Sequence, residues 1–412
     1  MTLRITGAAA GDLSIEGPED TLDASGCLVT PGLVNAHHHL LQTAFRTLPG
    51  TRGVPMATWL PTMAAAYDRV GVDAGLTYAA ARAGLAESLL CGVTTVADHH
   101  LTWPASLTPE ETVPLAQGTA RAAAELGARL VFVRGAARDD PETAAHSADL
   151  IAEALVGDAP GGVSADGMLQ VAVGPAGVHS DPEPTFRLMG EVAARRGLRR
   201  RTQANEQVDV AIAAERYGRR PIDLLEEWGW LAPDVTLAHL CDVTPDEIRR
   251  LSAAGVSATH APGCDLPMGW GIAPVAALRA AGVEVGLGTS GGGSNDAGHL
   301  LADARLAMQV APLVGPPLAA ADVLAMATTG SAAGLGRPGL GSGTDLCVWD
   351  VSGVADAGVH DPGAGLLWAS PGRRPRHVVV AGRVVVRDGV LTTADEREIV
   401  ADLGRLSACA AP

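Results

Sequence analysis

The stretch VTPGLVNAHHHL, residues 29–40, decides how the chain folds, because an apolar run in it ends abruptly in three histidines. Alternate side chains of a β-strand point to the same side, so a strand here would aim His37 and His39 into one space and turn His38 away. Two imidazoles on one side are typical of a metal site or of acid–base catalysis. The remaining question is which other groups share that space.

Seven further β-rich runs follow, and amphipathic, alanine-rich stretches separate them. The candidate strands read LVNAH, VTTVAD, ARLVFVRG, LQVAVGP, RRTQANE, VTLAHL, VSATHAP and VEVGLGTS. Strands that alternate with helices indicate a parallel sheet, and eight such units predict an α/β fold of the (β/α)₈ barrel (TIM barrel) type. An open doubly wound sheet is the alternative architecture, but no glycine fingerprint for a dinucleotide follows any of these runs.

The two ends of the chain differ from its middle. LRITG and DLSIEG near the start, and TDLCVWD and RHVVVAGRVVVRDGVL near the end, are strand-like. The last of these runs is broken by a glycine, which favours a hairpin. We therefore predict a small flanking β-domain built from residues 1–30 and 342–412, beside a barrel of residues 31–341 that carries the active site.

Composition narrows the classes of partner. The 412 residues carry a net charge of −16, which argues against a nucleic-acid partner because no basic surface can be assembled from them. No apolar run is long enough to cross a membrane, and the start has no signal-peptide pattern. The six cysteines are scattered without a C-x-x-C pair, which fits a reducing compartment. We expect a cytoplasmic protein with no membrane partner.

Polar side chains gather where the candidate strands end. In a barrel the active site forms at these ends, and most of the twelve histidines fall there. We expect metal or catalytic duty for His37 with His39, and at most a supporting role for one of His99 and His100. Cys264 is not expected to act as a nucleophile, since no activating base stands near it in sequence.

Several segments resemble one known family. DASGCLVTPGLVNAHHHLLQTAFR, CGVTTVADHH, TLAHLCDVTPDEI, GIAPVAALRAAGVEVGLG and GSNDAGHLLADARLAM look like family segments in the family's order. They are similar to the amidohydrolase superfamily in its branch of heterocycle deaminases, most of all to 8-oxoguanine deaminases and triazine hydrolases. The resemblance covers nearly the whole chain. It implies a barrel hydrolase that acts on a C–N bond of a small nitrogen heterocycle, and relatives that are commonly dimers suggest a homodimer.

The resemblance also implies a set of metal ligands, and this chain departs from it. In the family one divalent ion is held by two histidines of strand one, a histidine of strand five and an aspartate of strand eight. The first pair maps onto His37 and His39. The other two positions map onto Gln203 and Ser290, so two of the four ligands are substituted. The strand-five glutamate survives as Glu206, and the strand-six histidine, which orients the attacking hydroxide in the family, survives as His239.

These substitutions predict that no cofactor is bound tightly. A four-ligand zinc site is worth about 10–16 kcal/mol, so losing half of the ligands removes about 5–8 kcal/mol. That loss corresponds to about 10⁴–10⁶ in affinity. We expect His37 and His39 to bind zinc or another divalent ion only if the site is rebuilt with His179, His239 or Asp265.

The remaining polar and aromatic positions predict a pocket for a small planar molecule. Trp59, Trp103 and Trp270 could stack on a ring, or they could simply fill a core that is poor in aromatics. Arg46 could instead brace the first loop. The predicted substrate-binding residues are Gln42, Arg46, Arg134, Trp103, His179, Gln203, Asp265 and Ser290.

The surviving groups lead to one favoured function and two alternatives. Glu206 and His239, with His37 and His39, could transfer protons around one substrate atom. The favoured function is hydrolysis of a C–N bond, by deamination or ring opening, without the family's tightly bound metal. The alternatives are a metal-independent acid–base enzyme of another class (elimination, cyclisation or isomerisation) and a non-catalytic ligand-binding relative.

Overall fold

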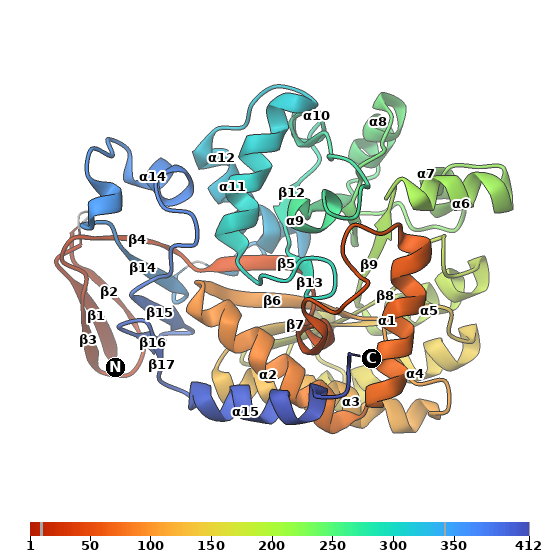
Figure 1. The fold of residues 1–412 in the computed structure, drawn as a ribbon, viewed down its shortest axis with the longest axis horizontal. Helices are drawn as coiled ribbons and strands as arrows, with labels where there is room; N and C mark the ends of the chain where they lie inside the picture. Colours follow the sequence, from red (N-terminus) through yellow and green to blue (C-terminus); the bar gives the residue numbers. More distant parts are fainter. Residues whose placement is uncertain (9–10, 342, 412) are drawn as a thin grey trace.

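The predicted parallel strands curve into one sheet in the computed structural model, which describes residues 1–8, 11–341 and 343–411 (Figure 1). The strand order is β12-β11-β10-β9-β8-β7-β6-β5-β13. β13 pairs in parallel with β5, so the end of the sheet closes onto its beginning, and the predicted (β/α)₈ barrel is confirmed. The strands are β5 (Leu33–His39), β6 (Val93–His100), β7 (Arg129–Ala136), β8 (Leu169–Pro175), β9 (Arg199–Ala204), β10 (Val235–His239), β11 (Ser257–His260), β12 (Val285–Leu287) and β13 (Ser290–Gly291).

Helices surround the barrel, and their ends carry clear sequence signals (Figure 1). α3 and α8 each begin with a capping box, in which a threonine and a glutamate satisfy the free amides of the first turn. The helices that follow strands are α2 (Ala74–Leu90), α3 (Pro109–Leu126), α4 (Pro141–Val156), α5 (Glu183–Arg196), α6 (Val208–Tyr217), α7 (Pro221–Glu227), α8 (Pro245–Ala253), α9 (Pro262–Asp265), α10 (Val275–Ala280), α11 (Leu300–Val310), α12 (Ala320–Ala325) and α13 (Ser331–Gly334). A further helix, α1 (Met56–Val70), precedes α2.

Both chain ends contribute to a flanking β-domain, as predicted. One sheet holds β1 (Thr2–Thr6), β2 (Leu13–Glu16) and β3 (Asp20–Asp23). The other holds β4 (Cys27–Pro31), β14 (Leu346–Asp350), β15 (His377–Val380), β16 (Arg383–Arg387) and β17 (Val390–Leu391). Leu3 and Ile5 of the first sheet share a buried core with Val348 of the second. The boundaries at residues 30 and 342 remain a prediction.

The C-terminal stretch also holds two helices that the strand-like pattern did not indicate. α14 (Pro362–Trp368) follows β14, and α15 (Glu396–Ser407) ends the chain. α15 packs along α2 on the barrel (Figure 1). Its polar and apolar residues alternate with a helical period, and Ile399 is buried.

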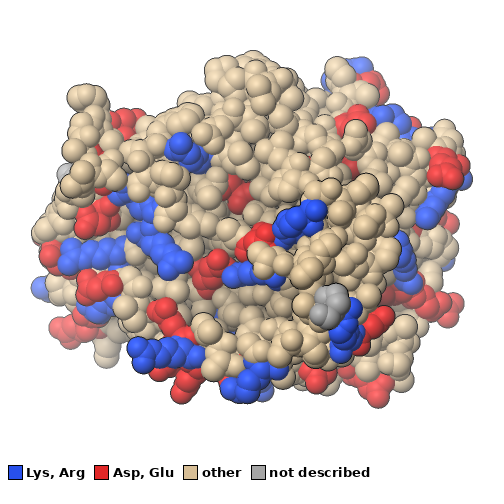
Figure 2. Space-filling model, viewed as in Figure 1, with Lys and Arg blue, Asp and Glu red and all other residues tan. Residues whose placement is uncertain are grey.

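The surface shows no concentration of positive charge on the face drawn in Figure 2, where acidic and basic side chains are interspersed. Within the described part of the chain, none of the helices combines the length and apolarity that crossing a bilayer needs.

β8 and β9 lie unusually close together, and this close approach fixes the position of β9, the strand that carries Gln203. A β-carbon added to Gly174 would lie 1.4 Å from the carbonyl oxygen of Arg201 and 2.6 Å from its carbonyl carbon. Those atoms belong to the backbone of β9, so a side chain could be accommodated only if the strand moved. The absence of a side chain at Gly174 therefore fixes how closely β9 packs.

We predict that Gly174→Ala lowers the free energy of unfolding by about 3 kcal/mol or more, because the added methyl group overlaps backbone atoms. Urea denaturation measures this change. Gly190→Ala is the matched control: Gly190 lies inside α5, where an added β-carbon would stand 3.6 Å from Trp230 Nε1, an ordinary contact. That variant should gain about 0.5–1 kcal/mol from helix propensity. Equal stability of the two variants would contradict the packing account.

Candidate active site

A cavity of about 250 Å³ opens at the carboxyl ends of the barrel strands, next to α1. Its lining combines polar groups from the strand ends with large apolar side chains from the loops. Seven of the predicted site residues line it: His39, Gln42, Trp103, His179, Gln203, Glu206 and Ser290.

The three histidines of β5 point as the strand period predicts. The rings of His37 and His39 lie side by side, with centroids 4.8 Å apart. His38 turns away and hydrogen-bonds through Nδ1 to the Ser290 carbonyl oxygen and, at 2.9 Å, to the Thr289 hydroxyl. Burial lowers the pKa of His37 well below its usual value, and the neighbouring imidazoles add to this effect. His37 is therefore neutral, and it has a buried Nε2 without a hydrogen-bond partner among the described residues.

His239, at the end of β10, is held from both sides. Its Nδ1 lies 2.6 Å from Asp265 Oδ1, and its Nε2 lies 3.1 Å from Gln203 Oε1. The Gln203 amide donates through Nε2 to the Ala176 carbonyl oxygen, which leaves its own oxygen facing His239. Both ring nitrogens of His239 thus face acceptors, an arrangement that requires a proton on each.

The charge of His239 follows from these contacts. Burial disfavours the protonated ring, but the Asp265 carboxylate, with Glu206, outweighs burial and raises the pKa of His239 above its usual value. The residue also has a left-handed backbone, with φ of 77°. A histidine held there pays strain that its hydrogen bonds must offset. These contacts favour the protonated form of the ring at the end of β10.

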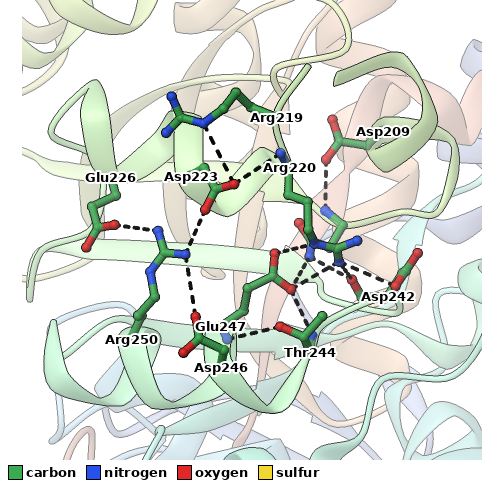
Figure 3. Close-up of polar contacts among 11 residues, drawn as sticks. Asp209, Arg219, Arg220, Asp223, Glu226, Asp242, Thr244, Asp246, Glu247 and Arg250 are labelled. Carbon is green, nitrogen blue, oxygen red and sulfur yellow. Dashed lines mark hydrogen bonds and ion pairs between the residues drawn. The ribbon is translucent and has the colours of Figure 1, made fainter. Parts of the chain in front are cut away.

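Ion pairs and hydrogen bonds around Arg220, Asp242 and Glu247 form a network beside the loop that follows β9 (Figure 3). Asn205, which precedes Glu206, donates from Nδ2 to the Asp242 carbonyl oxygen at 2.7 Å, and its backbone N–H donates to Asp209 Oδ2 at 2.8 Å. Arg220 bridges Glu247 and the Asp242 carbonyl oxygen at 2.7 and 2.6 Å. The loops after β9 and β10 are thereby tied together, which positions Glu206 against His239.

Glu206 is fully buried, and neither of its carboxylate oxygens has a hydrogen-bond partner among the described residues. Burial raises the pKa of this carboxyl, although His179 and His239 pull it down. Its Oε1 lies 3.8 Å from His239 Nε2. A carboxyl with a raised pKa that lines a cavity next to a histidine is suited to proton transfer.

Three predicted substrate-binding residues do not line the cavity: Arg46, Arg134 and Asp265, the last of which instead contacts His239. Arg46 pairs with Glu87 of α2, which fits the bracing role considered above. Arg134 is buried, donates to Asp139 at 2.8 Å and lies 4.8 Å from the Trp103 ring centroid. Since both guanidinium groups are already engaged, we assign them to supporting the loops rather than to contacting a ligand.

Part of the lining was not anticipated from the sequence. Beside Trp59, which was considered above for the pocket, four further large side chains along one face of α1 cover the cavity: Met56, Leu60, Met63 and Tyr67. The signal for them was present, because their spacing of three and four residues is that of one helix face.

Comparison with known proteins places the chain among well-described enzymes. The model of the amidohydrolase family matches residues 28–385. An 8-oxoguanine deaminase of Pseudomonas aeruginosa is 33% identical over 95% of this chain and 89% of its own length. A 5-methylthioadenosine/S-adenosylhomocysteine deaminase of Halobacterium salinarum is 31% identical over 92% of this chain and 86% of its own. The crystal structure of an atrazine chlorohydrolase from Arthrobacter aurescens TC1 complexed with zinc superimposes with a TM-score of 0.88, at 31% identity, over 98% of this chain and 100% of that one.

Since this structural relative is complexed with zinc, a divalent ion is a reasonable cofactor for the fold, and the expectation of no cofactor is not supported by the comparison. The donor groups at the position that the resemblance implies nevertheless do not fit such an ion. Gln203 and Ser290 offer neutral oxygens there, and the Gln203 oxygen is already bonded to His239. Among the described residues, the histidines of β5 belong to no group of three His, Cys, Asp or Glu ligand atoms lying within 4.8 Å of one another.

We predict that Asp265→Asn lowers the pKa of His239, because the carboxylate that favours the charged ring is lost while burial remains. Carbon-13 NMR of histidine-labelled, chelator-treated protein measures this pKa. Asp296→Asn, which removes a partly exposed carboxylate paired with Arg52, is the control and should leave it unchanged.

The same pair predicts a pH dependence of stability. A raised pKa means that the folded state holds the His239 proton more tightly than the unfolded chain does. The resulting stabilisation is complete below about pH 6.5 and is lost as the pH rises through the pKa of His239. Urea denaturation across this pH range should show that the free energy of unfolding falls less steeply with rising pH in Asp265→Asn than in the wild type. An equally steep fall in both proteins would contradict the assignment.

Proposed function

The chain belongs to the amidohydrolase family and is a hydrolase of non-peptide C–N bonds, and from that premise we propose that it deaminates, or opens the ring of, a small nitrogen heterocycle by Glu206 and His239 acid–base chemistry. The observation that carries the proposal is the buried, unpartnered carboxylate of Glu206 on the cavity wall, 3.8 Å from His239.

The two groups have complementary roles in this proposal. Glu206 takes a proton from a water molecule that attacks the ring carbon, and it returns that proton to the departing nitrogen. Positioned proton transfer of this kind contributes about 10²–10⁴ in rate. His239, whose ring Asp265 orients through Nδ1, donates from Nε2 and stabilises the negative charge that develops as the water oxygen adds.

The cavity suggests what kind of molecule binds. Trp59, Trp103 and Trp270 present flat apolar surfaces, while Gln42 and Ser294 add polar groups. Such a lining favours a planar ring with a few hydrogen-bonding edges over a charged or flexible substrate. We therefore propose a small-molecule heterocycle as the substrate; a homodimer remains a prediction.

We predict that Glu206→Gln lowers kcat by about 10²-fold or more, because the amide keeps the volume of the side chain but cannot accept the proton. Ammonia release and ultraviolet spectra across aminopurines, pterins and triazines provide the assay. Glu215→Gln on the exposed side of α6 is the control and should retain full activity. Unchanged turnover in Glu206→Gln would exclude this carboxyl as the proton carrier, and a wild type that turns over no compound with or without zinc would count against the proposed reaction.

A further inference from the structure

We propose that a divalent ion of the zinc class binds between β10 and α9, held by His239, Cys264 and Asp265 with His260 as the fourth ligand, instead of at the histidines of β5. The inference concerns the binding site of the ion and does not depend on which compound the enzyme hydrolyses.

The first observation is a ready set of ligand atoms. Among the described residues, one group of three His, Cys, Asp or Glu side chains has ligand atoms that all lie within 4.8 Å of one another: His239, Cys264 and Asp265. All three are buried, with at most 1% of each exposed. Buried groups of this kind are rarely a solvated acidic cluster, and nitrogen, sulfur and oxygen donors together are typical of zinc.

The second observation is an unpartnered pair beside that group. Asp265 Oδ2 and His260 Nδ1 are buried, lie 3.6 Å apart, and have no hydrogen-bond partner among the described residues. Leaving such buried polar atoms without a partner destabilises the fold. An ion bound to both atoms would remove that destabilisation, and His260 would complete a four-ligand set with two nitrogens, one sulfur and one oxygen.

Three of the four proposed ligands already have atoms within 4.8 Å of one another, and His260, which is not in that group, must move closer to complete the set. Zinc bonds of about 2.0–2.3 Å place tetrahedral ligand atoms about 3.3–3.8 Å apart. The 3.6 Å between His260 Nδ1 and Asp265 Oδ2 already agrees with this range. The 2.6 Å between His239 Nδ1 and Asp265 Oδ1 must widen by less than about 1.5 Å as the proton between them is replaced by the ion. The Cys264 thiol would lose its proton as well, so binding should release protons.

Charge also favours this position over β5. Arg201 is buried in the barrel, donates to the Ala36 carbonyl oxygen, and has no ion pair to a carboxylate within the described ranges. Burial and the neighbouring imidazoles are the main causes of the lowered pKa of His37, and the charge of Arg201 lowers it further. A dication beside His37 would meet this repulsion, whereas one beside Asp265 would meet a carboxylate.

The test uses cobalt as a spectroscopic substitute for zinc. Chelator-treated protein is titrated with Co²⁺ and its absorption is followed, because a thiolate ligand gives an intense near-ultraviolet charge-transfer band that histidine and carboxylate ligands do not. We expect this band to saturate at one ion per chain in the wild type. Cys264→Ser should lose the band and bind Zn²⁺ more than about 100-fold more weakly in a competition assay with a chromophoric chelator.

Two controls make the result specific. Cys409→Ser, at an exposed cysteine, should keep the band and the affinity. The double variant His37→Ala/His39→Ala should also keep both, and circular dichroism verifies that each variant is folded. A wild type that binds no ion, one that binds an ion without the thiolate band, or a double variant that alone loses binding would overturn the proposal. Since no readout uses turnover, such a failure is distinct from a failure of the proposed reaction.

Discussion

The hydrogen bond between His239 and Asp265 is the interaction on which the rest of the site depends. It is buried at the ends of β10 and α9, and it measures 2.6 Å. By occupying Nδ1, it aims Nε2 of the ring at Gln203 and Glu206. It also sets the charge of the ring, because burial alone would keep the imidazole neutral. The left-handed backbone of His239 is tolerated because these contacts determine the position of the residue.

The distribution of charge across the barrel mouth follows from this pair. On the β5 side, the imidazoles of His37 and His39 are neutral. The other two ligand positions of the family hold the Gln203 amide and the Ser290 hydroxyl, and the buried guanidinium of Arg201 lies nearby. On the β10 side stand two buried carboxyls, Glu206 and Asp265. The family relationship and a zinc-complexed structural relative make a divalent ion a reasonable cofactor, so the comparisons do not support the expectation of metal independence. What differs in this chain is where its own charges would attract an ion.

Much of this arrangement could be predicted from sequence, and the exceptions have physical reasons. The end of a strand can be recognised from the local sequence. The alternation of strand-like and helical segments was therefore enough to predict that His39, Gln203 and Glu206 lie at one cavity. The tertiary partners of a side chain are not local. The sequence does not show that Glu87 engages Arg46 or that Asp139 engages Arg134, and both arginines were expected at the ligand. Asp265 was noted in the sequence, but its contact with His239 depends on the fold of α9, which no periodicity reveals.

The measurement that tests the account most directly is the fate of solvent oxygen. A heterocycle that the enzyme consumes is incubated in water labelled with oxygen-18, and the product is analysed by mass spectrometry. If Glu206 activates water for attack on the ring, each turnover adds a single labelled oxygen at the carbon whose bond to nitrogen breaks. A product formed without solvent oxygen would mean elimination, cyclisation or isomerisation, and would contradict hydrolysis.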